Sequence, residues 1–313
     1  MTSDAMSGLN GYETLLLSPH ADDALFSAHA LITAVQPEVW TVFAGEPDSG
    51  GPTAWDLQCG YDNSQELVRQ RREEDEAAFE GLGVRLRHLP LLERAYTTVA
   101  RRRSDLAALA QELEAWVSER GKRPAMILVP VGAGTQMVPG LLDRVRGSRR
   151  HRPSSPEAGS PPELDEPTAP RSEPAPFRLL KGLVQRVLHW GFKRRRAAAR
   201  KRGMLANEDH LAVRDLVVRQ FGSRDDVVVG AYEELPYLWG CPGDEQAQHL
   251  ARQLGAAAVE VRLPVDRGDK VTRLAAYATQ VRLMDPQRRR LESARTLPPQ
   301  ERLWLYPNQG SGA

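Results

Sequence analysis

The sequence predicts an α/β fold in which a mostly parallel sheet carries helices on both faces. Short apolar segments alternate with longer segments of helical periodicity, and glycine or proline separates most of them. Nearly continuous apolar runs of this kind are typical of strands buried on both faces of a parallel sheet. The chain has 313 residues, enough for one large domain with additions or for two small domains.

The first half of the chain shows this alternation. Residues 14–17 predict a short buried strand, and residues 24–33 have apolar side chains at helical spacing. Residues 39–43 predict a second strand, because several glycines and prolines follow it as turn signals. A strongly charged helix over residues 64–81 then leads to a third strand over residues 84–89.

The second half continues the pattern after one interruption. A long helix over about residues 102–120 precedes the strand 126–131, which runs into the sequence PVGAG. Beyond the interruption, residues 208–221 predict a helix and residues 227–231 a strand. The last predicted strand and the last predicted helix are residues 259–263 and residues 270–283.

We therefore expect one Rossmann-like domain over residues 1–290, followed by a C-terminal tail over residues 291–313. An insertion over residues 140–203 interrupts the domain. Its part 147–176 is so rich in proline, serine and charge that it predicts a disordered linker. Its part 177–202 predicts a basic amphipathic helix, with an apolar face followed by a cluster of arginine and lysine.

Composition excludes several classes of protein. The 42 basic and 41 acidic residues leave a net charge of +1, so neither a general polyanion binder nor a nucleic-acid partner is expected. Cys59 and Cys241 are too few for a disulfide framework and predict packed thiols in a reducing compartment. The N-terminus lacks the basic start of a signal peptide, and no run of 18 apolar residues occurs. We therefore expect a cytoplasmic protein.

The sequence PHADD directly follows the first predicted strand and contains His20, Asp22 and Asp23. Taken alone this motif is a weak signal, because an aspartate at a helix N-terminus is common. A possible partner is His210, which opens the helix after the insertion. Strand ends that lie side by side would bring it to His20 and Asp23, and two imidazoles with one carboxylate are the ligand set of a catalytic zinc site. Asp22 would then be free to accept a proton from water.

Four motifs together resemble the PIG-L/LmbE-like superfamily of zinc-dependent N-deacetylases. They are, in the order of that superfamily, PHADD, RQRREEDEAAFEGLGV, ILVPVGAG and NEDH. The resemblance covers about residues 14–134 and 205–283. Members of the superfamily remove an acetyl group from N-acetylglucosamine units of glycolipids, pseudodisaccharide thiols or glycosylated natural products, and some cleave other amides.

The resemblance implies roles for individual residues. His20, Asp23 and His210 would bind Zn²⁺ or another divalent metal, and Asp22 would be the general base. Arg71 matches a position that tends to face the sugar, although a salt-bridged arginine on a solvated helix is an equally good interpretation.

Two positions depart from the superfamily pattern. Ala24 stands where a glutamate is usual, which affects a contact around the ligands and not the ligands themselves. Asn207 occupies the place of the first histidine in the His-x-Asp-His element, whose role is to stabilise the tetrahedral oxyanion. An asparagine amide can also donate to an oxyanion, so we keep Asn207 as a catalytic candidate with a different pH dependence.

The expected function is hydrolysis of the N-acetyl group of an amino sugar in a glycoconjugate, either lipid-linked or a natural-product glycoside. Two alternatives stay open: a catalytically weakened sugar- or membrane-binding protein, and an amidase with a non-sugar substrate. Residues 177–202 would suit peripheral contact with an anionic membrane at its inner face, but they could equally pack on the domain itself.

Other polar residues are expected to be structural. His29 predicts a packed or exposed helix residue and not a ligand. Lys270, Tyr277 and Gln280 share one side of the last predicted helix, from which Tyr277 could reach the crevice. Glu233 and Glu234 stand at a strand end, near the expected pocket, and receive no role.

Overall fold

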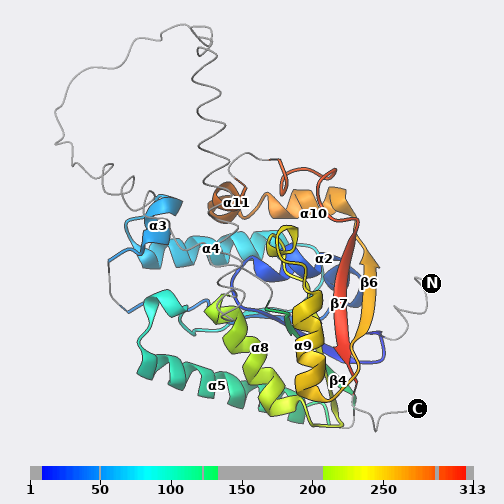
Figure 1. The fold of residues 1–313 in the computed structure, drawn as a ribbon. Coiled ribbons are helices and arrows are strands. Elements are labelled where there is room, and N and C mark those ends of the chain that lie inside the picture. Colours follow the sequence, from blue (N-terminus) through cyan, green and yellow to red (C-terminus); the bar gives the residue numbers. More distant parts are fainter. Residues whose placement is uncertain (1–8, 49–50, 122, 133–206, 286–288, 308–313) are drawn as a thin grey trace, which may run out of the picture. The chain divides into compact units, whose positions relative to one another are not determined.

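The computed structural model describes residues 9–48, 51–121, 123–132, 207–285 and 289–307 (Figure 1). They belong to one compact unit, formed by Met1–Gly134 and Ala206–Ala313. The predicted insertion over residues 140–203, with its linker and its basic helix, lies outside the described residues. Among the helices that are described, none is both long and apolar enough to cross a membrane.

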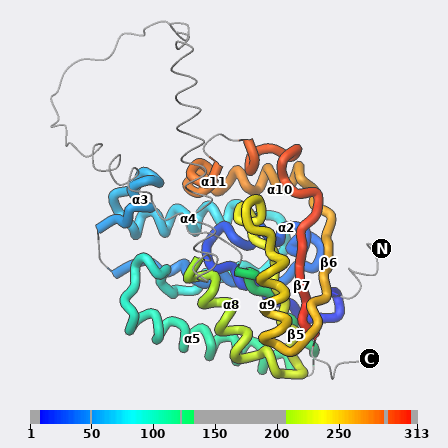
Figure 2. The backbone as a smooth tube through the Cα atoms, viewed as in Figure 1, coloured from blue at the N-terminus to red at the C-terminus, as the bar shows by residue number. Residues whose placement is uncertain are grey.

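A seven-stranded sheet in the order β3-β2-β1-β4-β5-β7-β6 forms the centre of this unit. The strands are β1 (Glu13–Ser18), β2 (Glu38–Thr41), β3 (Leu86–His88), β4 (Ala125–Pro130), β5 (Val227–Tyr232), β6 (Val259–Pro264) and β7 (Gln300–Tyr306). The first five strands in this order are parallel to one another. Only β7 runs antiparallel, between β5 and β6. The backbone of these three strands is labelled in Figure 2. The predicted α/β fold with a mostly parallel sheet is confirmed.

Helices cover both faces of the sheet. They are α2 (Asp23–Val35), α3 (Ala54–Cys59), α4 (Ser64–Phe79), α5 (Val99–Ser118), α8 (Glu208–Phe221), α9 (Asp244–Leu254), α10 (Arg267–Leu274) and α11 (Ala278–Met284), with the 3₁₀ turns η1 (Arg94–Tyr96) and η2 (Tyr237–Trp239). Alternate residues of β1 point to opposite faces, as the period of a strand requires. Leu15 and Leu17 pack toward α5, α8 and α9, and Leu16 packs toward α2, α4 and α10 (Figure 1).

The sequence-based description is wrong at the C-terminus. Residues 291–313 were expected as a tail beyond the domain, yet Gln300–Tyr306 is strand β7, hydrogen bonded on both sides within the sheet. Its sequence QERLWLY contains adjacent charges, Glu301 and Arg302, which argue against an internal strand. Glu301 forms an ion pair with Lys270, and Arg302 forms one with Glu233. These ion pairs allow the two charged residues to lie in an internal strand. Helices α3 and α9 were also missed, and the predicted helix 270–283 is two helices, α10 and α11.

Helix α2 is broken at Ala28, whose φ of −136° and ψ of 27° are not helical. At the break a buried ion pair replaces the helical bond that would join Ala30 N–H to Phe26 C=O. The Lys270 ammonium donates to the Phe26 carbonyl at 2.6 Å, and Glu301 accepts the Ala30 N–H at 2.7 Å. Lys270 and Glu301 are themselves 2.6 Å apart. The pair therefore joins α10 and β7 to the helix that begins with PHADD.

We predict that Lys270→Met destabilises the protein by about 3–5 kcal/mol, because it leaves the buried Glu301 carboxylate without a countercharge. Urea denaturation followed by circular dichroism measures this change. The double variant Lys270→Met with Glu301→Gln should recover part of the loss, since it removes both charges. Arg282→Met, at an exposed position of α11, is the control. A loss below about 1 kcal/mol in Lys270→Met would contradict the role of the pair.

Candidate functional site

The candidate site lies where the carboxyl end of β1 meets the start of α8. His20 belongs to the turn between β1 and α2, and Asp23 is the first residue of α2. Ser18 holds this turn closed, because its hydroxyl donates to His20 C=O at 2.6 Å and accepts the Ala24 N–H at 2.9 Å. His210 enters from the first turn of α8. Since β1 and β4 are adjacent, the element that follows β4 in the unit reaches the end of β1, as the sequence predicts.

His20, Asp23 and His210 meet at one buried point. The Nδ1 of His20 and the Nε2 of His210 each lie 3.1 Å from Oδ2 of Asp23, and the two nitrogens are 3.3 Å apart. In a tetrahedral zinc site with bonds of about 2.0–2.1 Å the donor atoms are about 3.3–3.4 Å apart. The chemistry and the spacing of the donor atoms therefore fit a divalent metal ion.

The other ring nitrogen of each histidine forms a hydrogen bond with a carboxylate. Asp209 Oδ2 is 3.1 Å from His20 Nε2, and Glu234 Oε1 is 2.6 Å from His210 Nδ1. Such partners place the proton on the outer nitrogen and direct the inner lone pair toward the metal position. Glu234 comes from the loop after β5 and also accepts the Gly132 N–H at 2.7 Å. The roles of Asp209 and Glu234 are not predicted from the sequence.

The carboxylates around the two imidazoles stabilise positive charge in the cluster. Burial opposes a charged His210, but Asp23 and Glu234 outweigh it and raise the pKa of His210 to about 9. Burial likewise opposes a charged His20, yet hydrogen bonds to Asp209 and Asp23 raise its pKa well above the ordinary value. Burial would raise the pKa of Asp23, but the two histidines lower it instead. A divalent cation bound between the three ligands would supply this positive charge.

Arg102, from the first turn of α5, anchors Asp209. Its guanidinium forms an ion pair with Asp209, donates to Leu92 C=O at 3.2 Å and lies 4.1 Å above the ring of Phe43. Asp209 also accepts the Arg94 N–H at 3.2 Å. Its carboxylate is thus held by Arg102 and Arg94 as well as by His20, which keeps it ionised and fixes its orientation.

Asp22 lies beside the ligands without serving as one. It occupies the N-cap position of α2, but its side chain makes no capping hydrogen bond. Burial, and then the neighbouring charge of Asp23, raises the pKa of Asp22 to about 7, although Arg71 and His20 act in the opposite direction. A buried carboxylate with a raised pKa is suited to accept and return a proton.

Arg71 lies on the buried side of α4 and not on a solvated helix face. Its Nη1 is 2.6 Å from Glu93, and its charge acts on Asp22. Glu74, one helical turn after Arg71, accepts hydrogen bonds from the backbone and the hydroxyl of Thr279 instead of pairing with Arg71. The Nε of Arg71 is buried and has no hydrogen-bond partner in the part of the chain that the structure describes. Contact with a substrate stays a prediction for this residue.

Asn207 caps α8, since its Oδ1 accepts the Asp209 N–H at 2.9 Å. Its side chain is also hydrogen bonded to the hydroxyl of Tyr237 in η2. The Tyr237 ring contacts His210 edge-on, with centroids 5.8 Å apart and planes at 79°. No role for Tyr237 is predicted from the sequence, although the motif YEELPYLW at a strand end is a signal that could indicate one.

The remaining polar candidates lie outside the ligand cluster. His29 is buried and pairs with Asp269 at 2.7 Å, in agreement with a packed residue. The Tyr277 hydroxyl donates to Asp75 at 2.7 Å. Glu233 pairs with Arg302 of β7. None of the three joins the ligand atoms.

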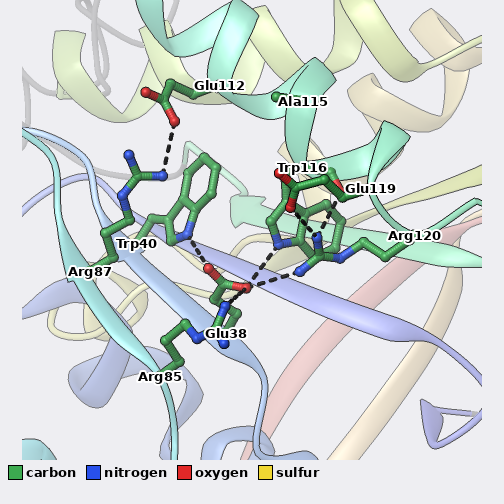
Figure 3. A pocket seen from close by; sticks show the side chains of 9 residues that line it. All are labelled: Glu38, Trp40, Arg85, Arg87, Glu112, Ala115, Trp116, Glu119 and Arg120. Carbon is green, nitrogen blue, oxygen red and sulfur yellow. Dashed lines mark hydrogen bonds and ion pairs between the residues drawn. The ribbon is translucent and has the colours of Figure 1, made fainter.

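A separate pocket of about 210 Å³ lies between β2, the residues around β3 and the C-terminal end of α5 (Figure 3). Glu38 occupies its centre and accepts hydrogen bonds from the indoles of Trp40 and Trp116 and from Arg120. Arg87 pairs with Glu112 at its rim. None of His20, Asp23 and His210 lines this pocket, and its charged groups largely pair with one another, so we assign it no catalytic role.

Comparison with known proteins agrees with the resemblance inferred from the sequence. Residues 15–138 match the family described as PIG-L, GlcNAc-PI de-N-acetylase. No curated protein matches the sequence significantly. The structure is similar to the zinc-inhibited form of teicoplanin deacetylase Orf2, with a TM-score of 0.57, 16% identity, and coverage of 96% of this chain and 99% of that one.

A second similar structure is the A40926 pseudoaglycone deacetylase Dbv21. Its TM-score is 0.55 and its identity 20%, with 94% of this chain and 96% of that one covered. A complex of the deacetylase with teicoplanin is similar at a TM-score of 0.54 and 17% identity, covering 94% of this chain and 98% of that one. At these identities the likeness shows a shared fold.

We predict that Arg102→Ala weakens Zn²⁺ binding by about 10–100-fold, because Asp209 would no longer hold His20 in its ligating orientation. Competition with a chromophoric chelator measures the dissociation constant. Arg102→Lys should retain part of the affinity, since it keeps the charge but not the planar contacts. Arg103→Ala, at an exposed position of the same helix turn, is the matched control. Equal affinities for Arg102→Ala and Arg103→Ala would rule out this anchoring role.

Proposed function

We propose that this chain, whose residues 15–138 belong to the PIG-L family, is a metal-dependent hydrolase that removes the N-acetyl group from an amino sugar in a glycoconjugate. The observation that carries the proposal is the convergence of His20, Asp23 and His210 on one buried point, with the carboxylate of Asp22 beside it. This is the ligand set and the base that hydrolysis of an unactivated amide requires.

The reaction consumes one water and converts the acetamide into a free amine and acetate. A divalent metal held by the three ligands would supply Lewis acidity, which polarises the carbonyl and lowers the pKa of water. Asp22 accepts a proton as the water oxygen adds to the carbonyl carbon. The C–N bond then breaks, and Asp22 returns the proton to the leaving nitrogen. Asp209 and Glu234 hold a proton on the outer nitrogen of each imidazole and keep the two rings oriented throughout.

The polar groups beside Asp22 support an amino sugar as the substrate. Arg71 and the partly buried Glu93 form an ion pair there, and the Nε of Arg71 has no hydrogen-bond partner among the described residues. Sugar hydroxyls both donate and accept hydrogen bonds, so an arginine beside a carboxylate is suited to them. The structural relatives named for teicoplanin and for the A40926 pseudoaglycone make a natural-product glycoside a reasonable substrate, and the family description makes a lipid-linked sugar another.

Three parts of the proposal rest on the sequence pattern alone. They are peripheral contact with an anionic membrane through residues 177–202, a location at the inner membrane face, and zinc in preference to another divalent metal. A non-sugar amide as the substrate is a further candidate, since some relatives of this superfamily cleave other amides.

We predict that Asp22→Asn lowers acetate release by at least about 10²-fold, because an amide cannot accept the proton. The bound metal should stay, since Asp22 is not a ligand. His210→Ala should instead lose the metal and the activity together. Metal content by mass spectrometry and acetate by a coupled assay, on N-acetylglucosamine glycosides and glycolipids, distinguish the two variants. A purified protein that binds no divalent metal, and that His210→Ala leaves unchanged, would exclude the proposal.

The alternative of a catalytically weakened sugar- or membrane-binding protein can be tested at Asn207. In a protein that has lost its chemistry, Asn207→His should raise the rate by more than about 10-fold, because it would restore an oxyanion donor. In a working enzyme we expect a fall, because histidine would break the cap on Asp209 and the contact with Tyr237. Steady-state kinetics of both proteins, on the substrate with the highest wild-type rate, separate the two outcomes. Asn207→Ser, which keeps a capping side chain, is the control for the helix start.

A further inference from the structure

Tyr237 is fixed beside the candidate ligands by the loop that follows β5. Three residues earlier in this loop, Glu234 binds His210. The next N–H, that of Leu235, donates to Ser27 of α2 at 3.1 Å. The Tyr237 carbonyl accepts the N–H groups of Gly240 at 2.9 Å and Cys241 at 2.8 Å, which closes the turn. The backbone position of this tyrosine therefore depends on the same groups that orient the metal ligands.

The side chain of Tyr237 is half-buried and lies over the site. Its ring meets the edge of His210 with centroids 5.8 Å apart and planes at 79°. The charges of Asp23 and Asp22 both act on its hydroxyl. The phenolic oxygen is thus close to the ligand cluster and to the candidate base, in a residue that is only partly buried.

The hydrogen bonds of Asn207 determine which way the Tyr237 hydroxyl donates. The amide oxygen of Asn207 is already used, because it accepts the Asp209 N–H at 2.9 Å. The group that faces Tyr237 is then the amide N–H, which donates to the phenolic oxygen. Within the described part of the chain no carbonyl or carboxylate accepts the Tyr237 O–H. This proton is therefore available to a ligand.

We propose that Tyr237 is a further catalytic residue, whose O–H donates a hydrogen bond to the carbonyl oxygen of the scissile acetamide as that oxygen becomes negatively charged. The proposal rests on the proposed function. Asn207 acts through Tyr237: its N–H holds the phenolic oxygen and strengthens the phenol as a donor. A donor aimed at developing charge in a buried site lowers the barrier more than it tightens substrate binding.

The test is Tyr237→Phe in the full chain loaded with Zn²⁺, since this variant keeps the ring on His210 and removes only the hydroxyl. We expect kcat to fall by about 10²–10³-fold while KM changes by less than about threefold. The dissociation constant of Zn²⁺ should not change. Tyr306→Phe is the matched control, because it removes another tyrosine hydroxyl, bonded to Ala247 C=O at 3.2 Å, far from the ligands in sequence.

A second measurement separates donation to the oxyanion from a structural role. A phosphonamidate analogue of N-acetylglucosamine carries a tetrahedral centre, and its affinity should fall by about 10²-fold in Tyr237→Phe. The affinity for the planar N-acetylglucosamine should stay within about threefold. Wild-type kinetics in Tyr237→Phe, or equal losses of both affinities, would overturn the role of Tyr237 and leave the proposed function standing. Absence of acetate release from the wild-type protein would overturn the proposed function itself.

Discussion

The negative charge around two buried imidazoles is the constraint on which the site depends. Asp23 faces both His20 and His210 at 3.1 Å, and Asp209 and Glu234 bind their outer nitrogens. Three carboxylates in a buried volume are costly unless positive charge lies between them. Protons on the histidines can supply that charge, and a divalent cation supplies it with all three ligands at once. The frame of β1, α2, α8 and the loop after β5 keeps these groups together.

The same compensation of buried charge recurs where the C-terminal strand enters the sheet. Glu301 of β7 pairs with Lys270 at the break of α2, and the next residue, Arg302, pairs with Glu233 after β5. Both pairs join β7 to elements that also carry site residues, since α2 begins with Asp23 and Glu234 follows Glu233. The strand thus stabilises the ligand frame although it contributes no ligand.

Asn207 connects two elements of the site. Its amide oxygen caps α8 and its amide nitrogen reaches Tyr237, so the residue ties the start of α8 to the loop after β5. An imidazole cannot make both contacts in the same way, because it lacks a carbonyl oxygen. The shared fold with glycopeptide deacetylases leaves room for such local differences, because the ligands are held by the backbone and by the outer carboxylates.

The amino-acid sequence by itself determined the alternation of strands and helices and the separate motifs that carry His20, Asp22, Asp23 and His210. These are local properties: hydrophobic period, turn residues, and polar side chains directly after an apolar strand. Tertiary structure alone decided that β7 is part of the sheet, that Asp209 and Glu234 back the histidines, and that Arg102 and Tyr237 adjoin them. Each of these facts joins residues far apart in the chain, and no local pattern records which charge meets which partner after folding.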